Sequence, residues 1–107
     1  MNIPQITADE VKKAIDNHEE VVLLDVRTPG EYSRGHIAGS INVPVEELGK
    51  TIEDIITDKT KKLHVYCLSG ARSNEAVEEL IKLGYTHVFS MINGLLMWRA
   101  KHYPLSM

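Results

Sequence analysis

The sequence contains a single cysteine, Cys67, so the 107-residue chain cannot form an internal disulfide. Structural zinc sites combine several cysteine or histidine ligands at characteristic spacings, and neither Cys67 nor the five histidines show such a spacing. A glycine-rich nucleotide-binding motif is also missing. We therefore expect no metal and no cofactor. Cys67 is then either a small buried hydrophobic residue or a reactive thiol.

Long hydrophobic runs are missing as well. No apolar stretch approaches the roughly 20 residues that a membrane helix needs, and the N-terminal residues lack the basic-then-apolar order of a signal peptide. The formal net charge of −3 gives no reason to invoke nucleic acid or an anionic membrane as a partner. These features predict a cytoplasmic protein with no nucleic-acid or membrane partner.

Length and composition predict one domain spanning residues 1–107. A chain of this size buries roughly two thirds of the surface of its unfolded form, and its apolar share of 43% is ordinary. No internal repeat, linker or low-complexity segment divides it.

Short apolar runs alternate with helical patterns along this chain. Strands are predicted at residues 3–6, 21–24, 41–44, 63–66 and 87–90. A first helix is predicted after Thr7, whose spacing to Glu10 is that of a capping box. Further helices are predicted as one or two segments within residues 45–56, from about residue 71 to 82, and around residues 95–98. We expect a chain break at residues 28–30, an ordered but irregular connection over residues 31–40, and a frayed tail from Tyr103. The alternation predicts an α/β fold with a mostly parallel sheet of about five strands and helices on both faces.

Cys67 lies where a predicted strand ends and a helix begins. In parallel sheets the carboxyl edge is where ligands bind. The intervening loop can turn backbone N–H groups toward the sulfur, because Gly70 permits the bend and the positive end of the helix lies behind it. Such surroundings lower the pKa of a thiol and favour a reactive cysteine over a buried core one. Arg72 is predicted either to hold an anionic substrate or to brace loop carbonyls, and Ser73 is a candidate helix cap.

Three segments resemble the rhodanese-like sulfurtransferases. Residues 67–73 resemble the family's active-site loop, residues 23–44 resemble its N-terminal signature, and Gly94 with Trp98 resembles its C-terminal element. Together they cover about residues 7–99 in the family's order. One departure is Asn93, where the family often has a glycine; asparagine tolerates a left-handed backbone, so we expect the turn to be kept.

The resemblance implies a three-layer α/β domain and a two-step transfer of sulfane sulfur. Cys67 would take the outer sulfur of thiosulfate or a related donor as a persulfide, and cyanide or a thiol, including a protein thiol, would then accept it. The residues implied to bind the substrate are Leu68, Ser69, Gly70, Ala71, Arg72, Ser73 and Arg27. For Arg27 the alternative is an ion pair with Asp25 or Glu31.

Two other functions remain open on the sequence. A cysteine phosphatase would also use a thiolate beside an arginine, but phosphatases of this plan have five residues between cysteine and arginine, and here four separate Cys67 from Arg72. A sulfur carrier or a protein-binding module of rhodanese-like fold is the other, although inactive modules of that kind often lack the cysteine.

Overall fold

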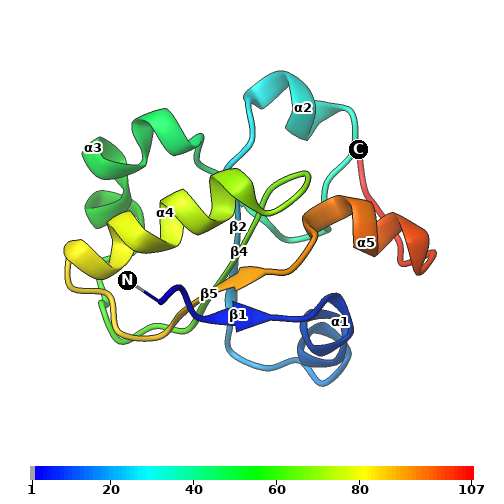
Figure 1. Cartoon of the computed structure of the whole chain (residues 1–107), viewed down its shortest axis with the longest axis horizontal. Helices are drawn as coiled ribbons and strands as arrows, with labels where there is room; N and C mark the ends of the chain where they lie inside the picture. Colours follow the sequence, from blue (N-terminus) through cyan, green and yellow to red (C-terminus); the bar gives the residue numbers. More distant parts are fainter. Residues whose placement is uncertain (1) are drawn as a thin grey trace.

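The computed structural model describes residues 2–107, and within them five parallel strands form one sheet with helices on both faces (Figure 1). The strands are β1 (Gln5–Ile6), β2 (Val22–Asp25), β3 (Ile41–Asn42), β4 (Leu63–Tyr66) and β5 (Val88–Met91). The helices are α1 (Ala8–Asp16), α2 (Pro29–Ser33), α3 (Val45–Ile55), α4 (Ala71–Lys82) and α5 (Gly94–Ala100). The strand order is β1-β5-β4-β2-β3. The predicted α/β fold is confirmed.

Strand β4 is the middle of the sheet and divides the core in two. Side chains alternate along a strand, so Leu63 and Val65 point to one face and Tyr66 to the other. The first two belong to the cluster packed under α3 and α4, and Tyr66 belongs to the cluster under α1 and α5. Figure 1 shows these two helix pairs on opposite faces. All four residues of β4 are buried, which a covered parallel strand requires.

Capping boxes begin both α1 and α2. In α1 the Thr7 hydroxyl accepts from the Glu10 amide and the Glu10 carboxylate accepts from the Thr7 amide, as predicted. Thr28 and Glu31 repeat this pattern in α2, with Pro29 in the first turn. The predictions of a chain break at residues 28–30 and of an irregular connection after it were therefore wrong for residues 29–33, which form α2. The local start signal outweighs the nearby glycines because it satisfies two backbone donors.

The chain end is also more ordered than predicted. Ser106 pairs with His36 through two backbone hydrogen bonds of 2.7 and 2.9 Å, and the Trp98 indole donates to the Pro104 carbonyl at 2.9 Å. The prediction of a frayed tail was wrong, because the backbone of His36, far away in the sequence, and the side chain of Trp98 hold the tail in place. The predicted one or two helices within residues 45–56 are one helix, α3.

Residues 2–107 contain no helix with the length and apolar character required to cross a membrane.

Candidate active site

Cys67 follows β4 at the carboxyl edge of the sheet, and its side chain is 1% exposed. The loop from Cys67 to Gly70 lies between α2 and the start of α5 (Figure 1). Burial alone does not distinguish a reactive thiol from a core residue. The distinction depends on which groups contact the sulfur.

Two backbone amides point at the Cys67 sulfur. The N–H of Gly70 donates to Sγ at 3.1 Å, and the N–H of Ser73 donates at 3.3 Å. Gly70 is the N-cap of α4 and has φ of +112°, a conformation that favours glycine. The amides of Ala71 and Arg72 lie in the same first turn, where no helical carbonyl is available to them. The loop is therefore a cradle of donors open to a negative charge.

Ser73 contacts the sulfur instead of capping the helix. Its Oγ lies 3.6 Å from Sγ, donates to the Gly70 carbonyl at 3.1 Å and lies 2.7 Å from the Ser90 Oγ. Gly70 is the N-cap of α4 and supplies no side-chain cap, so the prediction for Ser73 was wrong. Ser90, on β5, was not predicted to belong to the site; its only signal was a hydroxyl within an apolar strand.

The pKa of Cys67 reflects two opposing effects. Burial by itself raises the pKa, because it disfavours the thiolate. The Ser73 hydroxyl and the amides of Ser73, Gly70 and Ser69 act in the other direction and hold the pKa below its ordinary value. The hydrogen bonds outweigh burial, which is the condition for a buried thiol to act as a nucleophile.

Arg72 forms an ion pair that the sequence did not predict. Its Nη1 and Nη2 donate to the two carboxylate oxygens of Glu31 at 2.7 and 3.0 Å. The predicted roles were substrate binding and bracing of loop carbonyls, and the observed partner is instead on α2. The pair joins α2 to the first turn of α4, across 41 positions of sequence.

Arg27 is 3% exposed and paired with Asp25, the alternative that the sequence left open. Its Nη2 donates to the Asp25 carboxylate at 2.7 Å and to the Gly35 carbonyl at 2.7 Å. The Asp25 carboxylate also accepts from the Arg27 amide at 2.9 Å. Arg27 thus anchors the connection after α2, at Gly35, to the end of β2.

The first turn of α5 supports the loop from the side opposite α2. The amides of Leu95 and Leu96 donate to the carbonyls of Cys67 and Leu68 at 3.0 and 3.1 Å. Gly94 contacts the loop so closely that a Cβ there would collide with both carbonyls. Asn93 has φ of +58°, so the left-handed turn predicted for it is confirmed. Leu68 is half-buried, and Ser69 and Ala71 are exposed.

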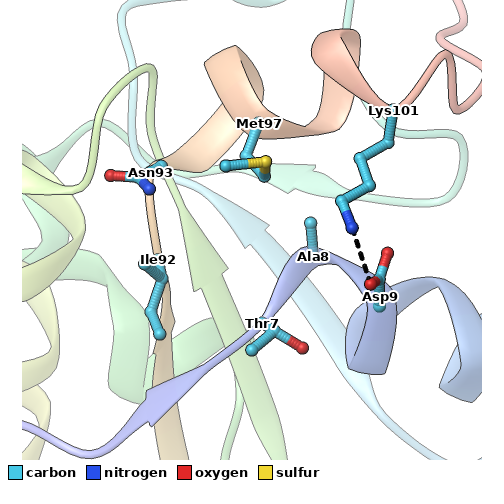
Figure 2. A pocket seen from close by; sticks show the side chains of 7 residues that line it. All are labelled: Thr7, Ala8, Asp9, Ile92, Asn93, Met97 and Lys101. Atoms are coloured by element: carbon cyan, nitrogen blue, oxygen red, sulfur yellow. Dashed lines mark hydrogen bonds and ion pairs between the residues drawn. The ribbon is translucent and has the colours of Figure 1, made fainter.

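A hollow of about 200 Å³ lies on another side of α5, between its residues and the start of α1. Figure 2 shows Asn93 and Met97 lining it, with Lys101 extended toward Asp9. No residue of the Cys67 loop lines this hollow. Among residues 2–107, no group of three or more histidine, cysteine or acidic side chains is arranged to hold a metal ion.

Comparison with known proteins gives consistent results. A family model described as a rhodanese-like domain matches residues 7–101. The chain is 42% identical over 65 residues to the thiosulfate sulfurtransferase PspE of Escherichia coli strain K12, covering 61% of this chain and 62% of PspE. It is 30% identical over 100 residues to the putative sulfur carrier protein YrkF of Bacillus subtilis strain 168, covering 94% of this chain and 53% of YrkF. The chain thus spans between half and two thirds of the length of these two relatives.

A solved structure shows the same fold. The rhodanese-related protein from Thermoplasma volcanium has a TM-score of 0.83 and 35% sequence identity to this chain. The alignment covers 96% of this chain and 97% of that one.

Proposed function

Because this chain belongs to the family of rhodanese-like domains, we propose that it is a sulfurtransferase that carries sulfane sulfur as a persulfide on Cys67. The observation that carries the proposal is the pair of amides, from Gly70 and Ser73, that donate to the sulfur. A core cysteine has no need of such donors. Residues 1–107 would act as one domain, with residues 68–73 and the support of Arg27 forming the substrate site.

In the first step the Cys67 thiolate attacks the outer sulfur of the donor. With thiosulfate, the new S–S bond forms on Cys67 as the bond between the two thiosulfate sulfurs breaks, and sulfite leaves with the bonding electron pair. The terminal sulfur of the persulfide is an anion. The free amides of Ala71 and Arg72 are suited to stabilise it, as an oxyanion hole stabilises an oxygen anion.

In the second step a thiophilic acceptor attacks the terminal sulfur and releases the Cys67 thiolate. Cyanide would leave as thiocyanate, and a thiol, including a protein thiol, would become a persulfide. This is covalent catalysis with ping-pong kinetics, because sulfite leaves before the acceptor binds. Similarity to a protein named as a putative sulfur carrier supports a protein acceptor as one form of this reaction.

Intact-mass spectrometry tests the proposal directly. Incubation with thiosulfate and removal of the excess should add ~32 Da, the mass of one sulfur atom, and cyanide should reverse the gain. Because Cys67 is the only cysteine, Cys67→Ser should show no gain. An unchanged mass for the wild-type chain would refute sulfur transfer.

The phosphatase alternative is tested separately. Turnover of a chromogenic phosphate ester that disappears in Cys67→Ser would favour it. We expect no turnover, because four residues between Cys67 and Arg72 make a cradle suited to one sulfur atom and too short for a tetrahedral phosphoryl group.

A further inference from the structure

Each arginine near Cys67 is already matched by a carboxylate. Arg72 donates hydrogen bonds from both terminal nitrogens to Glu31, and Arg27 forms an ion pair with Asp25. The charge that these four groups present to an incoming donor therefore sums to about zero. A site built to attract a small dianion would be expected to leave a guanidinium free for it.

Glu31 is held firmly in its ionised form. The bonds from Arg72 act against burial and, with the Thr28 contacts, lower the pKa of Glu31 to about 2. Its Oε1 also accepts from the Thr28 amide at 3.0 Å, as part of the capping box of α2. A substrate anion that displaced Glu31 from Arg72 would have to compete with a carboxylate fixed by its own helix.

The pKa of Arg72 is raised mainly by its bonds to Glu31, and charges on Cys67 and Glu46 act in the same direction. Arg72 is thus neutralised by Glu31, and the other charges that act on it, from Cys67 and Glu46, are negative as well. These negative charges repel a doubly charged donor more strongly than a singly charged one.

Apolar side chains lie beside the same loop. Leu68 is half-buried, and Leu96, on the first turn of α5, is 54% exposed. The bond from the Leu96 amide to the Leu68 carbonyl places these two residues together. An organic substituent on the donor would cover this apolar surface, whereas the oxygens of thiosulfate would not.

We propose that Glu31 is a specificity-determining residue: by neutralising Arg72 it makes the site favour singly charged organic sulfane donors over the thiosulfate dianion. This inference rests on the proposed function and names the class of its donor, a thiosulfonate or persulfide anion. With methanethiosulfonate, the Cys67 thiolate forms a bond to the terminal sulfur, the sulfur–sulfur bond of the donor breaks, and methanesulfinate leaves with the electron pair. Charge and atoms balance, and no oxidant is needed.

The test compares thiosulfate with methanethiosulfonate, in which a methyl group replaces one charged oxygen. Glu31→Gln removes the charge on residue 31, and glutamine still serves in a capping box. The ratio of kcat/KM for thiosulfate to kcat/KM for methanethiosulfonate should rise about fivefold, since no carboxylate then neutralises the positive charge of Arg72. Higher salt should shrink the gain.

Glu10→Gln is the matched control. Glu10 occupies the same capping-box position on α1, and it contacts Thr7 and not the loop. The substitution also removes one negative charge. In Glu10→Gln the ratio of the two kcat/KM values should stay within about twofold of the wild-type ratio. An equal ratio in Glu31→Gln and wild type, or an equal rise in both variants, would overturn the inference.

A measurement on the wild-type chain covers the case in which Glu31→Gln fails to fold. Between about 0.02 and 0.2 M salt, kcat/KM for thiosulfate should stay level or rise, because no net positive charge attracts the dianion and salt screens its repulsion by the thiolate. A steep fall with salt would reveal a free cation and refute the role of Glu31. Failure of the proposed function is distinguishable, because then neither donor would load sulfur on wild-type Cys67.

Discussion

At the scale of residues, the chemistry of Cys67 depends on a competition between burial and hydrogen bonding. A thiol that is 1% exposed would ordinarily resist ionisation. Here donors from three residues of the loop hold its pKa below the ordinary value despite that burial. The sulfur is thus held in the state that attacks, inside a site from which bulk water is largely excluded.

The Ser73 hydroxyl can turn its one proton from the Gly70 carbonyl to the Cys67 thiolate, and it can be removed without altering the backbone. Ser73→Ala should raise the pKa of Cys67 toward its ordinary value and slow alkylation at neutral pH severalfold, because burial then meets less opposition. The measurement is the pH profile of iodoacetamide alkylation, followed by intact mass. Ser69→Ala, which keeps the Ser69 amide and loses only an exposed hydroxyl, is the control. Identical profiles for the two variants would show that the Ser73 hydroxyl has no influence.

Residues of this site differ in how far the sequence could predict them. Cys67 and Gly70 carry local signals, since a strand end, a glycine and a helix start lie within a few positions. Glu31 and Ser90 carry no such local signal. Glu31 lies 41 positions from its partner Arg72, and Ser90 lies 17 positions from Ser73. The partner of Arg72 depends on where α2 lies in space, and the residues next to Arg72 in the sequence do not indicate the position of α2.

At the scale of elements, the start of α5 fixes the loop in place. Gly94 has φ of +46°, and a Cβ there would collide with the Cys67 and Leu68 carbonyls. Gly94→Ala should therefore destabilise the chain by about 2–4 kcal/mol, combining backbone strain with overpacking. It should also reduce sulfur loading on Cys67, because the loop must shift. Chemical denaturation and intact mass after thiosulfate treatment measure the two effects.

Gly39→Ala separates these two causes. Gly39 also has positive φ, +85°, but a Cβ there would meet nothing within 4 Å. It should show only the backbone strain, about 1–2 kcal/mol, with normal sulfur loading. Equal losses in the two variants would mean that the contact between α5 and the loop contributes nothing.

The elements themselves were largely predictable because their signals are local. Apolar runs gave all five strands, and the Thr7 capping box gave the start of α1. The same signal stands at Thr28 and Glu31, yet the glycines around it favoured an irregular segment, and α2 was missed. The ordered tail could not be predicted, since its order depends on a backbone pairing with His36, which only the fold brings to Ser106.

At the scale of the whole molecule, the core on the α1 face of the sheet contains a titratable side chain. His64 lies on β4, on the same face as Tyr66, and is 3% exposed. The His64 Nδ1 is buried and has no hydrogen-bond partner within residues 2–107. Burial, assisted by the charge of Lys62, lowers the pKa of His64 to about 4. The folded chain therefore holds this imidazole neutral.

This burial makes stability depend on pH over a defined range. The unfolded chain binds a proton at His64 near pH 6.5, and the folded chain does so only near pH 4, so protonation favours unfolding between these values. The stabilisation is complete above about pH 6.5 and is lost progressively as pH falls toward 4. Between pH 7.5 and 5.0 the free energy of unfolding should fall by about 2 kcal/mol.

Denaturant unfolding at a series of pH values measures this dependence. His64→Leu should flatten the curve over that range, whatever its effect on stability at pH 7.5, because the titrating group is gone. His87→Gln, which replaces an exposed imidazole, should keep the wild-type slope. Carboxylates such as Glu31, whose folded pKa is about 2, lose their contribution only as pH falls below their ordinary pKa, which is 4.5 for Glu31. A wild-type curve that stays flat to pH 5.0, or a His64→Leu curve that falls as steeply, would contradict a neutral buried His64.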